Sequence, residues 1–467
     1  MTTHHIAALL TPAWGQTTSY ISTATALLNK DPDVFITIVQ HNVMVAQMET
    51  ELATEGRVYD KQRLRIVGVG PKDKVPGYIE GLEQMVAGWI VTLEELTSAE
   101  VWPKPRTVHL DWNLGSGGDV VKVTKQILGS DCKTILFWST GALVMSSNGT
   151  DKLTGAVVKF PGGLELYDHE VHPYAVGPSR LMGAAVVDAH RFAKTVDGLI
   201  TTTSSCLEAG GVAYCRALYK NRGQELFAIG MQTHPLCWQV DVEVTPSDER
   251  IRAFLDRAVR EYGKKSVLYI SFGSIYFPIA TRDHIEAMVE TLLELEAPFP
   301  FIFALGAKVA TLPAELVERV NTSGKGLICD SWVEQRAILQ HGGVGWFLTH
   351  GGWNSLTESL TQGIPLIVWP ASGEQAINAA FVSTGPQPVA IQLFQIRTGA
   401  QLGPSLHTDA VITGSVEDAR IEFKATFTDA RGSKGKELQR NAAGMASALR
   451  ADHAGEAAEE LGRLARF

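Results

Sequence analysis

Residues 332–375 read WVEQRAILQHGGVGWFLTHGGWNSLTESLTQGIPLIVWPASGEQ, and this stretch decides how the chain folds. The apolar run over 344–349 predicts a buried strand, and the run over 366–369 predicts the next one. Between the two runs, Asn354 or Ser355 can cap the start of a helix. The stretch therefore predicts a strand, a turn, a helix and a second strand, which is the repeating unit of a parallel α/β sheet.

The turn before this helix has the composition of an anion-binding site. It reads His350-Gly351-Gly352, and glycines allow a backbone to come close to a ligand. The free N–H groups and the dipole at a helix start both attract negative charge. The sequence therefore predicts that a phosphate group binds where this helix begins.

The order and spacing of these residues resemble the box that marks the family 1 glycosyltransferases, named for plant enzymes that glycosylate small secondary metabolites. Trp332 stands at its first position and Gln375 at its last, with HGGWNSLTES and the terminal EQ in register without gaps. The resemblance implies an α/β chain of the GT-B fold, with two facing Rossmann-like, doubly wound domains. It also implies an inverting enzyme that moves glucose from UDP-glucose to a small, mostly apolar acceptor.

The resemblance assigns the nucleoside to four residues of this stretch. Trp332 would stack on the uracil ring, and Val333 would meet the edge of the base through its backbone. Gln335 would reach the ribose, and Glu358 would accept hydrogen bonds from the ribose hydroxyls. Each role suits its residue, because an indole offers a flat apolar face and a carboxylate accepts from a diol. Taken alone, a Trp or a His in such a sequence is more often structural, so the expectation depends on the joint register.

The resemblance also assigns the phosphates and the sugar. The diphosphate would be held by the run SFGS and by the turn and helix start, through Gly273, Ser274, His350, Gly352, Asn354 and Ser355. The sugar would meet Trp353, Glu374 and Gln375. Glucose is expected because relatives that use galactose tend to carry His at the position of Gln375. Neither a metal nor a further cofactor is implied.

Length and composition agree with a two-domain enzyme of the cytoplasm. The chain has 467 residues, 45% of them hydrophobic, so two or three domains with large cores are expected. Its net charge is −9 without a long basic run, which argues against nucleic acid or an anionic membrane as partner. Five cysteines without a CxxC pair are typical of reduced thiols. The start is a poor signal peptide, and no apolar run is long enough to span a membrane. The polar end differs from the membrane anchor of animal relatives, so we expect a soluble protein. We also expect a monomer.

Strand and helix patterns alternate along most of the chain, which predicts parallel sheets. The first series runs through strands expected at 5–10, 34–39, 64–69, 107–111, 134–138, 199–203 and 226–229, and the second begins at Ser266. We expect an acceptor-binding domain over 1–238, a UDP-sugar domain over 239–449, and a C-terminal helix over about 450–467 that crosses back to the first. An irregular stretch over 141–182, rich in Gly and Pro, would help to wall the acceptor pocket, as in the family. No GxGxxG follows the first strand, which weighs against dinucleotide binding.

The catalytic residues are where the chain departs from the family. Inverting members use a His that removes the acceptor proton and an Asp that orients the His. Asp111 ends the strand TVHLD and matches the Asp, but the Gly-His step aligns with Gly15-Gln16. Gln16 cannot act as a base, because an amide does not accept a proton near pH 7.

Three hypotheses for this departure stay open. The base can come from elsewhere, from Asp111 itself, from His109 beside it, or from His169 or His172. The acceptor can be an amine or a carboxylate that needs no base. The chain can also bind UDP-sugar without turnover, or act as a sugar-nucleotide epimerase on the same fold, which would need paired carboxylates near the sugar. Structural readings compete as well, with Asp111 as a strand-end cap and Gln16 as a turn residue.

A pair of acidic residues, Asp31 and Asp33, forms the DxD pattern that holds a metal in another class of glycosyltransferases. Here the pattern lies between a helix and a strand, with Pro32 in its middle. Asp and Pro in this arrangement are typical of a turn. We therefore expect a turn and not a metal site.

Overall fold

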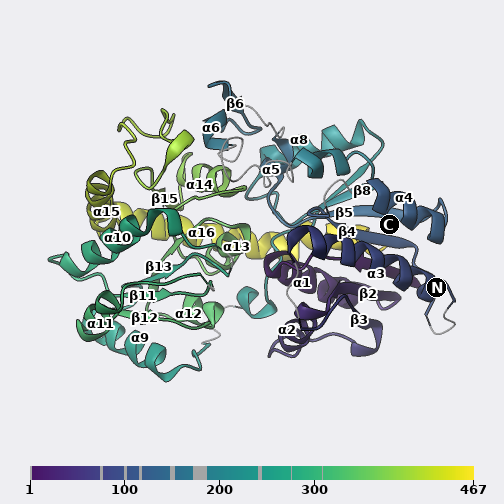
Figure 1. Ribbon diagram of the computed structural model, residues 1–467, viewed down its shortest axis with the longest axis horizontal. Coiled ribbons are helices and arrows are strands. Elements are labelled where there is room, and N and C mark those ends of the chain that lie inside the picture. The colour runs from purple at the N-terminus through teal and green to yellow at the C-terminus, as the bar shows by residue number, and fades with distance from the viewer. Residues whose placement is uncertain are drawn as a thin grey trace.

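Two parallel sheets stand side by side, and helices pack on the faces of each (Figure 1). The computed structural model describes residues 3–73, 77–98, 102–114, 118–147, 153–171, 187–239, 244–274, 276–307 and 309–467. We call the part built on the first sheet the first domain and the part built on the second sheet the second domain. The alternation of strands and helices in the sequence therefore predicted the layers of the molecule correctly.

The first sheet has seven strands in the order β3-β2-β1-β4-β5-β8-β9. Its strands are β1 (His4–Leu9), β2 (Val34–His41), β3 (Leu64–Val69), β4 (Thr107–Asp111), β5 (Lys133–Trp138), β8 (Gly198–Thr201) and β9 (Glu225–Ala228). Its helices are α1 (Trp14–Lys30), α2 (Asn42–Leu52), α3 (Tyr78–Ser98), α4 (Gly118–Leu128), α5 (Ala142–Ser146), α6 (Asp168–Val171) and α8 (Ala209–Lys220). A short antiparallel hairpin, β6 (Val157–Lys159) and β7 (Glu165–Tyr167), lies within the stretch predicted to be irregular.

The second sheet has six strands in the order β12-β11-β10-β13-β14-β15. Its strands are β10 (Val267–Ser271), β11 (Phe301–Ala304), β12 (Gly326–Cys329), β13 (Val344–Thr349), β14 (Leu366–Val368) and β15 (Ala390–Gln392). Its helices are α9 (Glu249–Tyr262), α10 (Arg282–Glu294), α11 (Ala314–Thr322), α12 (Gln335–Gln340), α13 (Trp353–Thr361), α14 (Gln375–Ser383) and α15 (Val416–Arg431). The central strands are fully buried, as helices on both faces of a sheet require.

The strand order of each sheet reverses at one place, and ligands bind at such places in open parallel sheets. In the first sheet the order reverses between β1 and β4, and in the second between β10 and β13. The strand ends concerned lead into Thr11, Asp111, Gly273 and His350. The four loops that carry the sequence motifs therefore start from the reversal points of the two sheets.

The helix α14 belongs to the cores of both domains. Ile377 and Ala380 pack into the hydrophobic cluster of the first domain. Ala379 and Val382, on other positions of the same helix, pack into a cluster of the second domain. Because Gln375 is the first residue of α14, this shared helix fixes one of the predicted sugar ligands relative to both domains.

The last two helices run from the second domain to the first. α16 (Ser433–Ala454) packs against α13 and α15, and α17 (Glu456–Leu464) packs against α1 and β9. In Figure 1 this yellow segment crosses the middle of the molecule to the first sheet. Leu461 and Leu464 are buried in the cluster that holds Ile6 and Tyr20. The predicted return of the C-terminal helix is what the structure shows.

Two expectations about local structure have clear outcomes. The predicted helix cap is wrong, because α13 begins at Trp353 with Gly352 as its N-cap and without a side-chain cap. The predicted turn at Asp31 is present, since the Asp31 carboxylate accepts a hydrogen bond from the Asp33 N–H at 2.9 Å. Within the described ranges, no helix has both the length and the apolar sequence needed to cross a bilayer.

The returning helix should stabilise the first domain by apolar burial. We expect Leu464→Ala to lower the free energy of unfolding by about 2–5 kcal/mol, because it leaves a cavity at a site with no solvent exposure. Denaturant unfolding followed by circular dichroism measures this loss. Glu459→Ala, on the exposed side of the same helix, is the control. Equal stability of the two variants would show that the helix does not dock as described.

Candidate functional site

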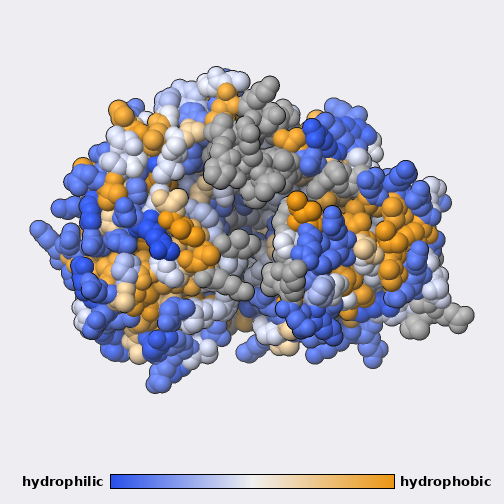
Figure 2. Space-filling model, in the orientation of Figure 1, coloured by the Kyte–Doolittle hydropathy of each residue, from blue (hydrophilic) through white to orange (hydrophobic). Residues whose placement is uncertain are grey.

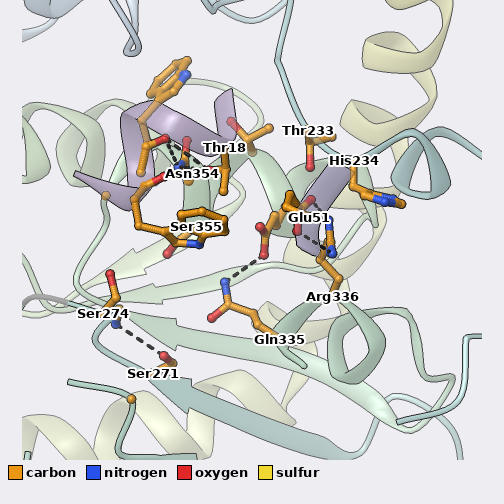
Figure 3. Close-up of a pocket in the computed structure, with 18 of the residues that line it drawn as sticks. Thr18, Glu51, Thr233, His234, Ser271, Ser274, Gln335, Arg336, Asn354 and Ser355 are labelled. Atoms are coloured by element: carbon orange, nitrogen blue, oxygen red, sulfur yellow. Dashed lines mark hydrogen bonds and ion pairs between the residues drawn. The ribbon is translucent and has the colours of Figure 1, made fainter. Parts of the chain in front are cut away.

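A cavity of about 860 Å³ lies between the two domains. The space-filling view shows a hollow between the two halves of the molecule, and a close-up shows part of its lining (Figures 2 and 3). Every residue predicted to bind the nucleotide sugar lines this one cavity: Gly273, Ser274, Trp332, Val333, Gln335, His350, Gly352, Trp353, Asn354, Ser355, Glu358, Glu374 and Gln375. The structure therefore brings together residues that are up to about a hundred positions apart in the sequence.

Two side chains of the cavity lining form a polar pair, and an exposed indole lines the same cavity. Gln335 donates a hydrogen bond from Nε2 to the Glu358 carboxylate at 2.8 Å, and its Oε1 accepts one from the Tyr269 hydroxyl at 3.3 Å. Burial raises the pKa of Glu358, and the bond from Gln335 and the charge of Arg336 offset part of the rise. The Trp332 side of the cavity is open, since 61% of this residue is exposed. A flat apolar face beside hydrogen-bonding groups matches a nucleoside.

His350 directly follows β13, and two glycines leave the space that its imidazole ring fills. A Cβ on Gly352 would lie 2.5 Å from His350 Nε2, and a Cβ on Gly273 would lie 3.0 Å from its Cε1. Gly273 also has φ +84°, which a side chain would strain. Burial lowers the pKa of His350 to about 4, so the ring is neutral near pH 7. A neutral imidazole in this place can donate one hydrogen bond to an anion.

The side chain of Asn354 crosses to the first domain instead of capping its own helix. Its Nδ2 donates to the Gly15 carbonyl at 2.7 Å, and its Oδ1 accepts from the Ser19 hydroxyl at 2.9 Å. The start of α13 is therefore free of a side-chain cap and faces the cavity through Gly352 and Ser355. Such a helix start suits an anionic group.

The indole of Trp353 also joins the two domains. Its Nε1 donates to the Thr202 carbonyl at 3.1 Å, and the residue is only 4% exposed. Trp353 lines the cavity, but its ring nitrogen is committed to the first domain. The predicted contact between this residue and a sugar has to come from its remaining atoms.

Two residues at the start of α14 offer complementary hydrogen-bonding groups. The Gln375 Oε1 accepts from the backbone N–H groups of Ala371 and Ser372, each at 2.9 Å, so its amide nitrogen is the group left to donate. Burial raises the pKa of Glu374, and the backbone N–H groups of Glu374 and Trp353 offset part of the rise. An acceptor and a donor side by side can bind neighbouring hydroxyls.

The first-domain wall of the cavity includes Gln16 but neither of the other two predicted catalytic residues. Gln16 lies in the first turn of α1 and lines the cavity with Trp14, Trp112 and Thr140. Asp111 has no solvent exposure and does not line the cavity. Its Oδ2 accepts from the Thr11 N–H at 3.0 Å and from the Thr11 hydroxyl at 2.6 Å. Burial raises the pKa of Asp111 to about 6, against the effect of these bonds.

The structure places His109, one of the histidines named as a source of the base, away from the cavity. His109 lies in the middle of β4, and its Nδ1 meets the Tyr20 hydroxyl at 2.8 Å beneath α1. Burial lowers its pKa to about 3, and it does not line the cavity. His169 is likewise outside the cavity, since its Nε2 donates to the Pro404 carbonyl at 2.9 Å. The fourth candidate, His172, lies outside the described residues.

One charged cluster in the cavity was not predicted from the sequence. Glu51 of α2 accepts hydrogen bonds from Arg57 and from Arg336 of α12, at 2.8 and 2.7 Å. All three residues line the cavity. Glu51 and Arg336 are far apart in the chain, so no local motif connects them. The only signal was that Arg336 directly follows Gln335.

In the part of the chain that the structure describes, no group of His, Cys, Asp or Glu has the arrangement of a metal site. The cavity instead combines uncharged donors, a helix start and buried carboxylates.

Comparisons of sequence place the second domain in a known family. A family profile described as UDP-glucoronosyl and UDP-glucosyl transferase matches residues 238–408. The chain is 33% identical over 286 residues to "UDP-glycosyltransferase eriJ" of Hericium erinaceus, which covers 60% of this chain and 55% of that protein. The match therefore spans about half the length of that relative.

Comparisons of structure cover the whole chain. A structure titled as Phytolacca americana UGT2 complexed with UDP-2fluoro-glucose and pterostilbene has a TM-score of 0.72 at 19% identity, covering 100% of this chain and 99% of that one. A UDP-glucosyltransferase from Polygonum tinctorium, described as capable of glucosylating indoxyl, has a TM-score of 0.73 at 19% identity, covering 99% and 98%. Such low identity shows a shared fold alone, which is GT-B. The sequence of the second domain is therefore similar to the UDP-glucoronosyl and UDP-glucosyl transferase family, and the whole chain shares the GT-B fold of the solved plant UDP-glycosyltransferases.

Proposed function

We propose that this protein transfers glucose from UDP-glucose to a small, mostly apolar acceptor, with inversion at the sugar carbon. The observation that carries the proposal is that the Gln335–Glu358 pair and the exposed Trp332 line one cavity, which both domains form. The uracil would stack on Trp332, and the ribose hydroxyls would bond to Glu358. The diphosphate would lie between His350 and the start of α13, where a helix dipole and N–H groups stabilise the departing UDP. We also propose that the transfer needs no metal and takes place in the cytoplasm.

The two ligands at the start of α14 support glucose as the sugar. Glu374 would accept from one sugar hydroxyl, and the Gln375 amide nitrogen would donate to a neighbouring one. The acceptor would lie against Trp14, Gln16 and Trp112 on the opposite wall. Attack from the first domain, with UDP leaving toward the second, places nucleophile and leaving group on opposite faces of the sugar, which accounts for inversion.

The absence of a base beside Gln16 favours acceptors that need none. The described first-domain lining includes Trp14, Trp112, Ser139 and Thr140, which are not general bases near pH 7, and also Glu51, Glu55 and His234. Glu51 is paired with Arg57 and Arg336, and His234 is hydrogen-bonded to Thr54, so both are committed to other partners. Asp111 is held by Thr11 behind this wall. We therefore propose an amine or a carboxylate as the nucleophile, with positioning and charge stabilisation supplying the rate. Tight UDP-glucose binding without transfer to any acceptor class would instead favour a binding protein.

The first prediction concerns the nucleotide. We expect Trp332→Ala to weaken UDP binding by about 1–3 kcal/mol, because stacking on the indole is lost. Isothermal titration calorimetry with UDP measures the change. Val411→Ala, at another exposed apolar side chain, is the control and should bind as wild type does. Wild-type affinity in Trp332→Ala would contradict the proposed stacking.

The second prediction concerns the missing base. We expect Gln16→His to raise the rate with a phenol or an alcohol by up to about 10²–10⁴-fold, because a positioned base removes the hydroxyl proton. The rate with an amine should change little. Product formation with matched phenol and aniline acceptors, followed by mass spectrometry, measures both, and Gln16→Ala is the control. A hydroxyl rate that does not rise would count against this account of Gln16.

The third prediction concerns Asp111. The folded state raises its pKa from 3.8 to about 6, so the folded protein binds a proton more tightly than the unfolded chain between these pH values. Stability contributed by this group therefore rises as the pH falls from 7 to 4, by about 2 kcal/mol for one such carboxyl. Denaturant unfolding of wild type and Asp111→Asn across this range isolates the effect. Parallel pH curves for the two proteins would show that the carboxyl is not perturbed.

A further inference from the structure

The nucleoside end of the cavity holds a charged cluster that spans the two domains. Arg57 Nη2 donates to Glu51 Oε1 at 2.8 Å, within the first domain. From the second domain, Arg336 donates through Nη1 to Glu51 Oε1 at 2.7 Å and through Nη2 to Oε2 at 3.2 Å. We call Glu51, Arg57 and Arg336 the clasp. Figure 3 shows Arg336 reaching Glu51 beside Gln335.

The clasp is too buried to be an ordinary surface ion pair. The side chains of Arg57, Glu51 and Arg336 are 1%, 11% and 29% exposed. Burial would raise the pKa of Glu51, but the charges of the two arginines and the bonds from them outweigh it and hold the pKa below its ordinary value. Glu51 is therefore ionised at neutral pH and bonds to both arginines. A two-pronged arginine–carboxylate contact of this kind fixes geometry as well as charge.

The helix α12 connects the clasp to the ribose site. Its first residue, Gln335, bonds to Glu358 and Tyr269 on the second-domain side of the cavity. Its second residue, Arg336, bonds to the first domain. Two neighbouring residues of one short helix thus face the proposed ribose site and the other domain. A shift of α12 changes both contacts together.

We infer that Arg336 is a positioning residue that couples nucleotide binding to closure of the two domains. The inference rests on the proposed nucleotide site. When the clasp is formed, α12 is held where Gln335 and Glu358 face the cavity; when the nucleotide is bound, α12 is held where Arg336 reaches Glu51. Each event favours the other by the same factor, because coupling between two equilibria is reciprocal.

A second ion pair also joins the two domains, so loss of the clasp should separate the domains only on the side where the clasp lies. Arg397 of the second domain forms an ion pair with Glu170 of α6 at 2.9 Å, with side chains 4% and 1% exposed. Close by, His169 donates to the Pro404 carbonyl at 2.9 Å. α6 contacts α14, the helix that starts at the sugar end of the cavity. The domains therefore stay joined on this side when Arg336 is replaced.

The geometry permits a clean variant. In Arg336→Met the Glu51 carboxylate keeps its bond to Arg57, so no buried charge loses its last partner. We expect the melting temperature to stay near that of wild type and the Kd for UDP to rise about fivefold or more. Arg336→Lys, which keeps the charge, should recover part of the affinity. Arg463→Met, which removes ion pairs to Glu225 and Glu460 at 2.9 Å each, outside the cavity, is the control.

Two further measurements separate closure from a local effect on the ribose ligands. Small-angle X-ray scattering should give the unliganded Arg336→Met protein a larger radius of gyration than wild type, and UDP should reduce it. Glu51→Gln removes the clasp carboxylate from the first domain and leaves Arg336 of the second domain unchanged. If the clasp acts through closure, this variant should weaken UDP binding as Arg336→Met does. The double variant should then bind no more weakly than either single one. Because Glu51→Gln leaves the buried Arg57 without its counterion, its folding is checked first by circular dichroism at low temperature.

The outcomes distinguish this inference from the proposed function. Wild type that gives no heat with UDP overturns the proposed function, and the inference with it. Wild type that binds UDP, with Arg336→Met at the same affinity, overturns the inference alone. Weaker binding in Arg336→Met with unchanged scattering, or a folded Glu51→Gln protein with wild-type affinity, also overturns it, because Arg336 would then act locally on Glu358.

Discussion

The amide of Asn354 bonds to the Gly15 carbonyl and to Ser19, and this contact sets the two domains face to face. It joins the first two turns of α1, the helix that follows β1, to the first turn of α13, so the reversal points of the two sheets meet across one cavity. The preceding residue, Trp353, makes another contact between the domains, because its Nε1 donates a hydrogen bond to the Thr202 carbonyl. Without these bonds, a helix start suited to phosphate would face solvent and not the wall that carries Gln16. The chemistry proposed for the cavity depends on this alignment.

Several polar side chains of the cavity are oriented by partners within the protein. Gln335 is oriented by Tyr269 and Glu358, and Gln375 by two backbone N–H groups. Because partners on one side fix these amides, each offers a defined donor or acceptor to the cavity. Groups that are already in place lose little entropy on binding. The clasp extends the same principle from single side chains to whole domains.

The sequence predicted the second domain well, because its motif residues are near one another in the chain and keep a fixed register. Strand and turn positions follow from local apolar runs and glycines, and all of the predicted nucleotide-sugar residues line one cavity. The prediction failed where a side chain found a distant partner. Asn354 has the type of a helix cap, but its partners Gly15 and Ser19 are in the other domain. The clasp was missed for the same reason.

The catalytic residues show a different limit. His109 and Asp111 are two positions apart in β4, so they point to the same face of the sheet. That face is covered by α1, which buries His109 against Tyr20. Asp111, at the end of the strand, accepts a hydrogen bond from the Thr11 hydroxyl. A histidine in the middle of a fully buried strand is better placed for packing than for proton transfer, and the alternation of the strand carried this information. No local pattern, by contrast, could show that Thr11, a hundred positions earlier in the chain, would donate hydrogen bonds to the Asp111 carboxylate.

The shared helix α14 has a consequence for engineering. Chimeras of two-domain enzymes are commonly built by joining the first half of one relative to the second half of another. Here Ile377 and Ala380 belong to the second half of the chain, but their side chains pack into the hydrophobic core of the first domain. An exchange at the linker would therefore place foreign side chains inside the first half, next to Glu374 and Gln375 at the start of α14. A hybrid that folds has to keep Ile377 and Ala380 complementary to the interior of the first domain, because the same helix also packs into the second.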